Sequence, residues 1–177
     1  PKSILLFTII GHCEEKNALR LVLDEAEIVN EEAICKVLNK EMLCAQKAGL
    51  DILYCIGEKE DDLNRWEEVL LSQLAVGLNG IDFKRVTIAY EPLWSIGPGK
   101  KAASSERITK VVDLIKENYS SLKVVYGGGL KAENVVDIAS IKDIDGGLIA
   151  LTRFVNDIGF YPNEFAEIVR KFIEVRK

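Results

Sequence analysis

The chain has 177 residues, the length of one domain, and 48% of them are hydrophobic, so the composition supports a buried core and excludes a disordered protein. The formal net charge is -5 and the basic residues are spread along the chain, which excludes a typical nucleic-acid-binding surface. The apolar runs are too short to span a bilayer and no secretory signal pattern is found, so we expect a cytoplasmic protein without membrane contact.

Five short apolar runs recur along the chain and predict five β-strands. They cover residues 3–10, 51–57, 85–90, 123–128 and 144–151. Each run is continuous rather than alternating, which is typical of parallel strands that are buried on both faces.

Helical patterns lie between these runs. They cover residues 31–48, 63–78, 108–119, 131–141 and 163–175. Because a strand is followed by a helix about five times, the sequence predicts an α/β fold with parallel strands and helices outside the sheet. We expect residues 1–177 to form a single domain. It is either an open doubly wound sheet or a partial TIM-type (β/α)8 barrel of about five βα units.

Both architectures place active sites at the carboxyl ends of strands, where this sequence has His12 and Glu91. His12 is the only histidine, and an imidazole there can donate to a carbonyl oxygen on which negative charge develops. Shielding of Glu91 by Pro92 and Trp94 would disfavour its charged form and favour a base near neutral pH. A structural histidine and a salt-bridged glutamate are the alternative interpretations.

Two glycine-rich segments follow the third and fourth predicted strands. The segment 94–100 contains a Gly-Pro-Gly turn, which predicts either a hinged lid over Glu91 or an ordinary loop. The backbone N–H groups of Gly127–Gly129 can cradle a phosphate, although tight turns use glycine as well. Together these features predict proton abstraction next to a carbonyl in a small phosphorylated molecule.

The four cysteines offer little for a metal site. Cys13, Cys35, Cys44 and Cys55 form no CxxC pair, and the chain has a single histidine. We therefore expect free thiols in a reducing compartment and no bound metal.

Four segments resemble, in chain order, motifs of the triosephosphate isomerase family. AYEPLWSIGPGK at 89–100 resembles the family's catalytic-glutamate and lid segment, which is usually close to AYEPVWAIGTGK. IIGHCEE at 9–15 resembles its GHSERR segment, LYCIGE at 53–58 its CIGE strand end, and VVYGGG at 124–129 its YGGS phosphate loop. The matches cover nearly the whole chain. They imply a divergent chain that corresponds to the fourth to eighth strands of the TIM barrel.

The resemblance implies roles for the acid and base residues. Glu91 would be the base that shuttles a proton between neighbouring carbons, and His12, as neutral imidazole, would polarise the carbonyl. Glu14 matches an acid that lies close to the catalytic pair. The implied reaction interconverts dihydroxyacetone phosphate and glyceraldehyde 3-phosphate, with no cofactor and no metal.

The resemblance also implies a phosphate site and a partner. Gly97, Gly127, Gly128 and Gly129 would surround the substrate phosphate with backbone N–H groups. About three βα units of the family barrel have no counterpart before His12. Because five strands leave two open edges, we expect a homo-oligomer or a complementing chain.

The sequence departs from the family pattern in places. The family's Asn-x-Lys segment is absent, Gly129 replaces a serine, and Ala150 and Leu151 replace a Gly-Gly pair. Arg153 is a candidate to supply an anion contact in place of the missing glycines. Three alternatives to triose phosphate isomerisation therefore stay open. They are an inactive barrel fragment, an isomerase of a tetrulose phosphate, and a phosphate-binding module of an open α/β fold.

Overall fold

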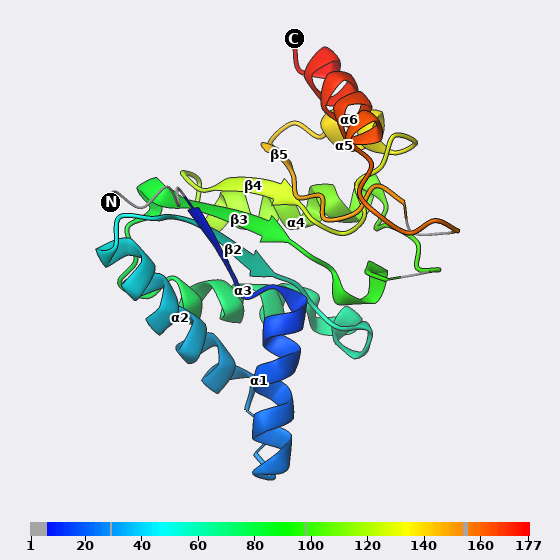
Figure 1. Ribbon diagram of the computed structural model, residues 1–177. Coiled ribbons are helices and arrows are strands. Elements are labelled where there is room, and N and C mark those ends of the chain that lie inside the picture. The colour runs from blue at the N-terminus through cyan, green and yellow to red at the C-terminus, as the bar shows by residue number, and fades with distance from the viewer. Residues whose placement is uncertain (1–6, 29, 98, 154–155) are drawn as a thin grey trace, which may run out of the picture.

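The computed structural model describes residues 7–28, 30–97, 99–153 and 156–177 (Figure 1). Its strands form one sheet in which every neighbouring pair is parallel. The strands are β1 (Phe7–Ile10), β2 (Asp51–Ile56), β3 (Val86–Tyr90), β4 (Lys123–Tyr126) and β5 (Gly146–Gly147).

The strand order distinguishes the two predicted architectures. The strands lie in the sheet in chain order, β1-β2-β3-β4-β5. A doubly wound sheet reverses its strand order at a switch point, whereas a (β/α)8 barrel adds each strand beside the previous one. The prediction of a partial TIM-type barrel is therefore confirmed, and the open doubly wound alternative is wrong.

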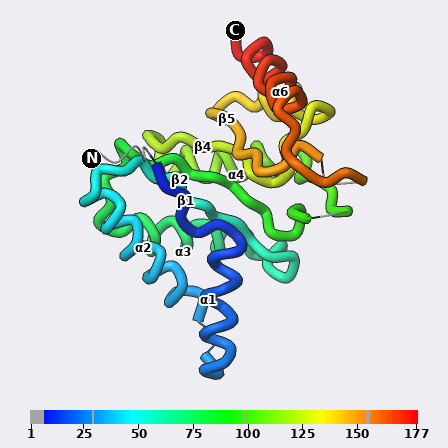
Figure 2. Tube along the Cα trace, in the orientation of Figure 1, coloured from blue at the N-terminus to red at the C-terminus, as the bar shows by residue number. Residues whose placement is uncertain are grey.

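Helices follow the strands and pack outside the sheet. They are α1 (Cys13–Glu25), α2 (Glu31–Lys47), α3 (Trp66–Gly77), α4 (Ser105–Asn118), α5 (Val135–Ala139) and α6 (Pro162–Val175), with 3₁₀ turns at Glu60–Arg65, Phe83–Arg85 and Leu93–Ser95. In Figures 1 and 2, α2 and α3 lie along one side of the sheet, α5 and α6 lie together beyond β5, and α1 projects away from the sheet. Across the described residues, no helix is both long and apolar enough to cross a membrane.

The core lies between the sheet and these helices. Alternate strand residues such as Tyr54, Ile88 and Tyr126 are fully buried, because the side chains of a strand point to opposite faces in turn. They belong to one apolar cluster that includes Leu38 of α2 and Leu74 of α3. This packing fixes the strands rigidly, so the residues at their carboxyl ends are held in place as well.

The other face and the two edges of the sheet are open. On β1, Phe7 is 57% exposed and Ile9 is 41% exposed, although both are large apolar residues in a strand. Within the described residues, β1 pairs with β2 alone and β5 pairs with β4 alone. Among the described residues, β1 and β5 therefore each leave one edge without a strand partner, and β1 exposes apolar side chains.

One helix was not predicted. The stretch that forms α1 has no single apolar stripe, because Leu21 and Val22 are 67% and 68% exposed while Leu19 and Leu23 pack against the core. The start of the helix is set by His12, which is its N-cap residue and whose side chain accepts a hydrogen bond from the Glu14 N–H.

Two predicted elements are shorter in the structure. The helix expected over 131–141 is reduced to α5, because the Asn134 side chain bonds the Lys131 N–H at 2.8 Å and the Gly129 carbonyl at 3.0 Å and holds the preceding residues in a turn. The strand expected over 144–151 is reduced to β5, which has a neighbour on one side among the described residues. Residues 3–6 of the first predicted strand and Pro98 of the predicted hinge lie outside the described residues.

Candidate active site

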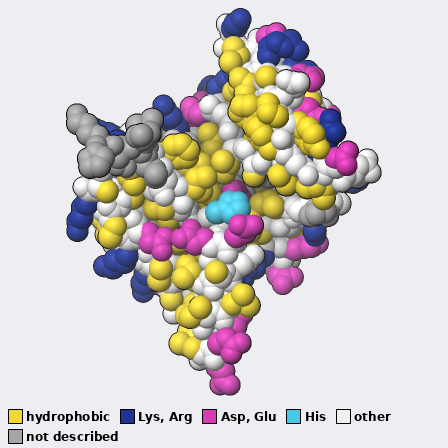
Figure 3. Space-filling view, viewed as in Figure 1, with side chains coloured by type: hydrophobic (Ala, Val, Ile, Leu, Met, Phe, Trp, Pro, Cys, Tyr) yellow, Lys and Arg dark blue, Asp and Glu magenta, His cyan; other side chains and the backbone are white. Residues whose placement is uncertain are grey.

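A cavity of about 280 Å³ opens at the carboxyl ends of the strands. It is lined by the residues predicted for catalysis and for the main phosphate cradle, which are His12, Glu14, Glu91, Gly97, Gly127, Gly128 and Gly129. Figure 3 shows the single histidine near the middle of one face, with acidic and hydrophobic side chains around it. The fold therefore brings together segments that are separated by more than a hundred residues in the chain.

Glu91 follows β3 directly and is 3% exposed. Its backbone N–H donates to the Ile56 carbonyl at 2.7 Å, which extends the sheet pairing to this residue. The neighbouring strands β2 and β4 are each followed directly by a glycine. A Cβ at Gly57 would lie 1.8 Å from the Glu91 carbonyl oxygen, and one at Gly127 would lie 2.9 Å from the Glu91 Cγ. Gly57 therefore makes room for the backbone of Glu91, and Gly127 makes room for its side chain.

The surroundings of Glu91 change its proton affinity. Burial raises the pKa of the Glu91 carboxyl, while the nearby His12 and Lys16 act in the opposite direction. A carboxylate with a raised pKa is a stronger base than an exposed glutamate, and it binds a proton more readily near neutral pH.

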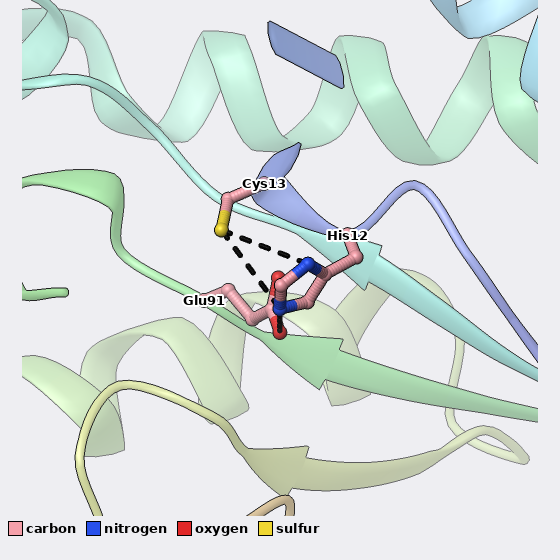
Figure 4. A group of neighbouring side chains, drawn as sticks. All are labelled: His12, Cys13 and Glu91. Atoms are coloured by element: carbon pink, nitrogen blue, oxygen red, sulfur yellow. Dashed lines mark hydrogen bonds and ion pairs between the residues drawn. The ribbon is translucent and has the colours of Figure 1, made fainter. Parts of the chain in front are cut away.

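His12 faces this carboxylate. Its Nε2 lies 3.6 Å from Oε1 of Glu91 (Figure 4). Its Nδ1 accepts a hydrogen bond from the Glu14 N–H at 3.5 Å. An acceptor role for Nδ1 places the proton of a neutral imidazole on Nε2, which points into the cavity toward Glu91. Glu14 thus orients the histidine through its backbone.

Cys13 completes a group of three polar side chains. Its Sγ lies 3.8 Å from both ring nitrogens of His12, and burial together with the charge of Glu91 raises the pKa of its thiol. The sequence treated Cys13 as an ordinary free thiol. Its place beside the two predicted catalytic residues depends on the approach of β3 to the start of α1, which no local pattern reveals.

Lys16 is a second residue that the sequence did not single out. It is 4% exposed, and its Nζ donates to the Cys55 carbonyl at 2.8 Å and to Oε1 of Gln73 at 3.1 Å. Burial lowers the pKa of the Lys16 amine. Its hydrogen bonds hold the start of α1 against β2, and its charge opposes the rise in the pKa of Glu91.

A buried ion pair anchors the start of the segment 94–100, which the sequence predicts to be a lid. Oε1 of Glu58, at the end of β2, accepts from Trp94 Nε1 at 2.8 Å, from Tyr90 Oη at 3.0 Å and from Arg107 Nη2 at 2.9 Å. Glu58 is fully buried, and the Arg107 guanidinium stacks over the Trp66 ring at 4.1 Å. The network ties the strand, the lid and α4 to one carboxylate.

The other end of the lid is held by Tyr126. Its hydroxyl accepts from the Ala103 N–H at 2.9 Å and donates to the Gly128 carbonyl at 2.6 Å. Between the two anchors, Gly97 and Gly99 have φ angles of +116° and +77°, which favour glycine. The segment predicted as a lid is therefore fixed at its ends, and the described residues between them include glycines with positive φ.

The three glycines after β4 differ in what their amides can do. The Gly127 N–H donates to the Tyr90 carbonyl at 2.8 Å and so continues the sheet. The predicted phosphate contact of this amide stays a prediction, and it would require the N–H to leave or share its bond to the Tyr90 carbonyl. Gly128 and Gly129 remain as the candidates for a phosphate cradle.

Arg153 has partners of its own at the start of α6. Its guanidinium forms an ion pair with Glu164 and lies 4.0 Å above the Tyr161 ring. The cavity wall nearby is instead formed by Leu148, Ile149, Ala150 and Leu151. The structure therefore gives Arg153 a different role from the anion contact that the sequence suggested.

The fold and this strand-end cavity define the chain as part of a TIM-type α/β barrel. The chain belongs to the triosephosphate isomerase family, because the family profile described as triosephosphate isomerase matches residues 5–171. It is 36% identical to the triosephosphate isomerase of Finegoldia magna over 157 residues, which cover 81% of this chain and 58% of that protein.

Two further relatives carry the same name. The chain is 37% identical to the triosephosphate isomerase of Geotalea uraniireducens over 150 residues, covering 76% of this chain and 57% of that protein. It is 34% identical to that of Synechocystis sp. over 167 residues, covering 92% and 61%. The chain thus spans about three-fifths of the length of the curated relatives that it matches.

The buried pair predicts unequal costs for two substitutions on α4. Arg107→Ala leaves the fully buried Glu58 without its cation, so we expect the free energy of unfolding to fall by about 3–5 kcal/mol. Lys110→Ala removes an exposed pair with Glu106 and should cost less than about 1 kcal/mol. Urea unfolding of both variants measures the difference, and equal losses would contradict the importance of the Glu58 network.

Proposed function

We propose that this chain carries the active site of an aldose–ketose isomerase that interconverts dihydroxyacetone phosphate and glyceraldehyde 3-phosphate. The observation that carries the proposal is the 3.6 Å approach of His12 Nε2 to the buried carboxylate of Glu91. The cavity supports a small substrate, because its volume of about 280 Å³ lies just below the usual range for pockets that take drug-sized ligands.

In the proposed reaction, Glu91 is the base. It removes a proton from the carbon next to the carbonyl and later returns it to the neighbouring carbon. The raised pKa of the Glu91 carboxyl supports this role, since a base works best when its pKa lies near the working pH. Because Glu91 is buried, its carboxylate carries little bound water that the substrate would have to displace.

His12 is the electrophile in the same reaction. As the proton leaves carbon, negative charge develops on the carbonyl oxygen, and the Nε2–H of a neutral imidazole stabilises it through a hydrogen bond. The contact between Nδ1 and the Glu14 N–H supports this tautomer. Glu14 therefore acts by orienting His12.

The phosphate of the substrate lies, in this proposal, between the lid and the loop after β4. The amides of Gly97, Gly128 and Gly129 are the proposed donors, and Gly127 contributes by leaving space for Glu91. Closure of the lid over this group would exclude water and protect the intermediate. We propose that the substrate is a phosphorylated sugar of three carbons, and the alternative is a tetrulose phosphate.

A second candidate function is a barrel fragment that works only when complemented. The open edges and the exposed apolar residues of β1 favour it. The helix α6 adds three exposed apolar residues at successive turns, which are Phe165, Val169 and Ile173. We propose that residues 1–177 act as one domain that associates through these surfaces with a second copy or with a complementing chain.

The free state of all four cysteines supports a reducing, cytoplasmic location.

Replacement of the proposed base gives the first activity test. Glu91→Gln keeps the size of the side chain but removes the base, so we expect kcat to fall by about 10²–10⁴-fold. The matched control is Glu117→Gln on the exposed part of α4, which should leave the rate unchanged. An isomerase assay with triose and tetrulose phosphates also identifies the substrate. Turnover that survives in Glu91→Gln would exclude Glu91 as the base.

The open surfaces predict association in solution. We expect sedimentation velocity at micromolar concentration to show a species larger than the monomer, because exposed strand edges and apolar patches favour pairing. Val169→Glu should shift the population toward monomer, whereas Arg170→Glu, one residue further along the same helix, should have a smaller effect. A monodisperse monomer for the unmodified chain would contradict this proposal.

A further inference from the structure

Three side chains with different metal-binding atoms meet in the cavity. An imidazole nitrogen of His12, the Sγ of Cys13 and a carboxylate oxygen of Glu91 all lie within 4.8 Å of one another. Figure 4 shows the three side chains pointing toward a common centre, two from the start of α1 and one from the end of β3. Among the described residues, His12, Cys13 and Glu91 are the histidine, cysteine and acidic side chains whose donor atoms lie close enough together to hold one metal ion.

The separations suit a tetrahedral zinc ion. Zinc bonds of about 2.3 Å to sulfur and about 2.0–2.1 Å to nitrogen and oxygen place a sulfur and a nitrogen about 3.6 Å apart and a nitrogen and an oxygen about 3.4 Å apart. The corresponding distances here are 3.8 Å between Cys13 Sγ and His12 Nε2, and 3.6 Å between that nitrogen and Glu91 Oε1. The third pair, Cys13 Sγ and the Glu91 carboxylate, lies within 4.8 Å. Because Sγ is equally distant from both ring nitrogens, it lies beside the ring and not along the Nε2 lone pair, so a rotation of the Cys13 side chain is needed to bring the sulfur to the metal.

The chemistry of the three donors selects the kind of ion. A thiolate and an imidazole favour zinc and other borderline or soft metals over magnesium and calcium, which prefer oxygen ligands. A thiolate and a carboxylate together neutralise a divalent charge, which suits the largely apolar wall formed by residues such as Ile96 and Leu148. The cavity leaves the fourth position open to water, as in zinc sites with three protein ligands.

Binding requires two proton movements. The Cys13 thiol must release its proton, and the proton on His12 Nε2 must move to Nδ1 so that Nε2 can bond the metal. The second movement costs the hydrogen bond from the Glu14 N–H to Nδ1, which at 3.5 Å is long and weak. Metal binding is therefore opposed by this weak hydrogen bond and by the proton of the Cys13 thiol, which the bound cation must displace.

We propose that His12, Cys13 and Glu91 form an inhibitory zinc site inside the catalytic cavity. A bound ion would occupy the lone pair of His12 and the carboxylate of Glu91, which are the two groups that the proposed isomerisation needs. The site goes beyond the proposed function, because zinc binding depends on the three side chains and not on turnover. Cys13 is the residue that adds the soft ligand.

Direct binding tests the proposal without substrate. Titration of the intact chain with Zn²⁺ in a calorimeter should show one site per chain, and Co²⁺ should give the absorption of a cobalt–thiolate bond. Cys13→Ser should weaken zinc binding by roughly tenfold or more and abolish the cobalt–thiolate band, because it replaces the soft ligand by a hydroxyl. Cys44→Ser, which changes an exposed cysteine on α2, is the matched control and should alter neither.

The same variants separate this proposal from the isomerase proposal. If the chain isomerises triose phosphates, Zn²⁺ should inhibit the unmodified enzyme reversibly, with recovery by a chelator, and should inhibit Cys13→Ser less. If the chain shows no turnover, the calorimetric and cobalt results still decide the metal site. Circular dichroism checks that Cys13→Ser is folded, and Glu91→Gln provides a second variant that should also weaken binding. Zinc affinity unchanged in both variants, or a cobalt band that disappears in Cys44→Ser instead, would overturn the proposal.

Discussion

The burial of the Glu91 carboxylate is the constraint on which the cavity depends. A carboxylate that is 3% exposed loses most of its hydration, and the protein must supply groups that make this position tolerable. His12 faces it at 3.6 Å, and Lys16 adds a positive charge from the start of α1. Gly57 leaves room for the backbone of Glu91, and Gly127 leaves room for its side chain. The sequence around each strand end is therefore shaped by the need to hold one acid in an apolar wall.

A second buried carboxylate, Glu58, differs from Glu91 because it is paired with a cation and has a structural role. It is paired with Arg107 and accepts hydrogen bonds from Tyr90 and Trp94, so it is a structural anchor that holds the first residues of the lid. Tyr126 holds the far end by its contact with Ala103. These two anchors flank the glycine-containing segment, whose residues Ser95, Ile96 and Gly97 line the same cavity as Glu91 and the loop after β4. The cavity wall thus combines anchored residues with a glycine-containing segment.

Much of the fold and the position of the cavity could be predicted from the sequence, for a physical reason. Continuous apolar runs and the helices between them reflect burial on both faces of a parallel sheet, and the carboxyl ends of such strands meet at one edge. Residues directly after those runs, such as His12 and Glu91, therefore met as expected. The strand order, which distinguishes a barrel from a doubly wound sheet, depends on tertiary pairing and needed the structure.

What the sequence did not reveal depends on contacts between distant segments. Lys16 is buried because Cys55 and Gln73 accept its protons, and Cys13 lies beside Glu91 because β3 reaches the start of α1. The use of the Gly127 amide in sheet pairing is likewise invisible in a run of three glycines. α1 was missed because its exposed apolar residues obscure the helical pattern, although His12 caps it.

The most direct test of this account is the pKa of Glu91 itself. Infrared difference titration of the carboxyl groups, with Glu91→Gln to assign the signal, measures it without substrate or metal. Because burial is the dominant influence, the signal that disappears in the variant should titrate above the ordinary glutamate value of about 4.3. Titration at or below that value would show that His12 and Lys16 outweigh burial, and would contradict the assignment of Glu91 as a desolvated base.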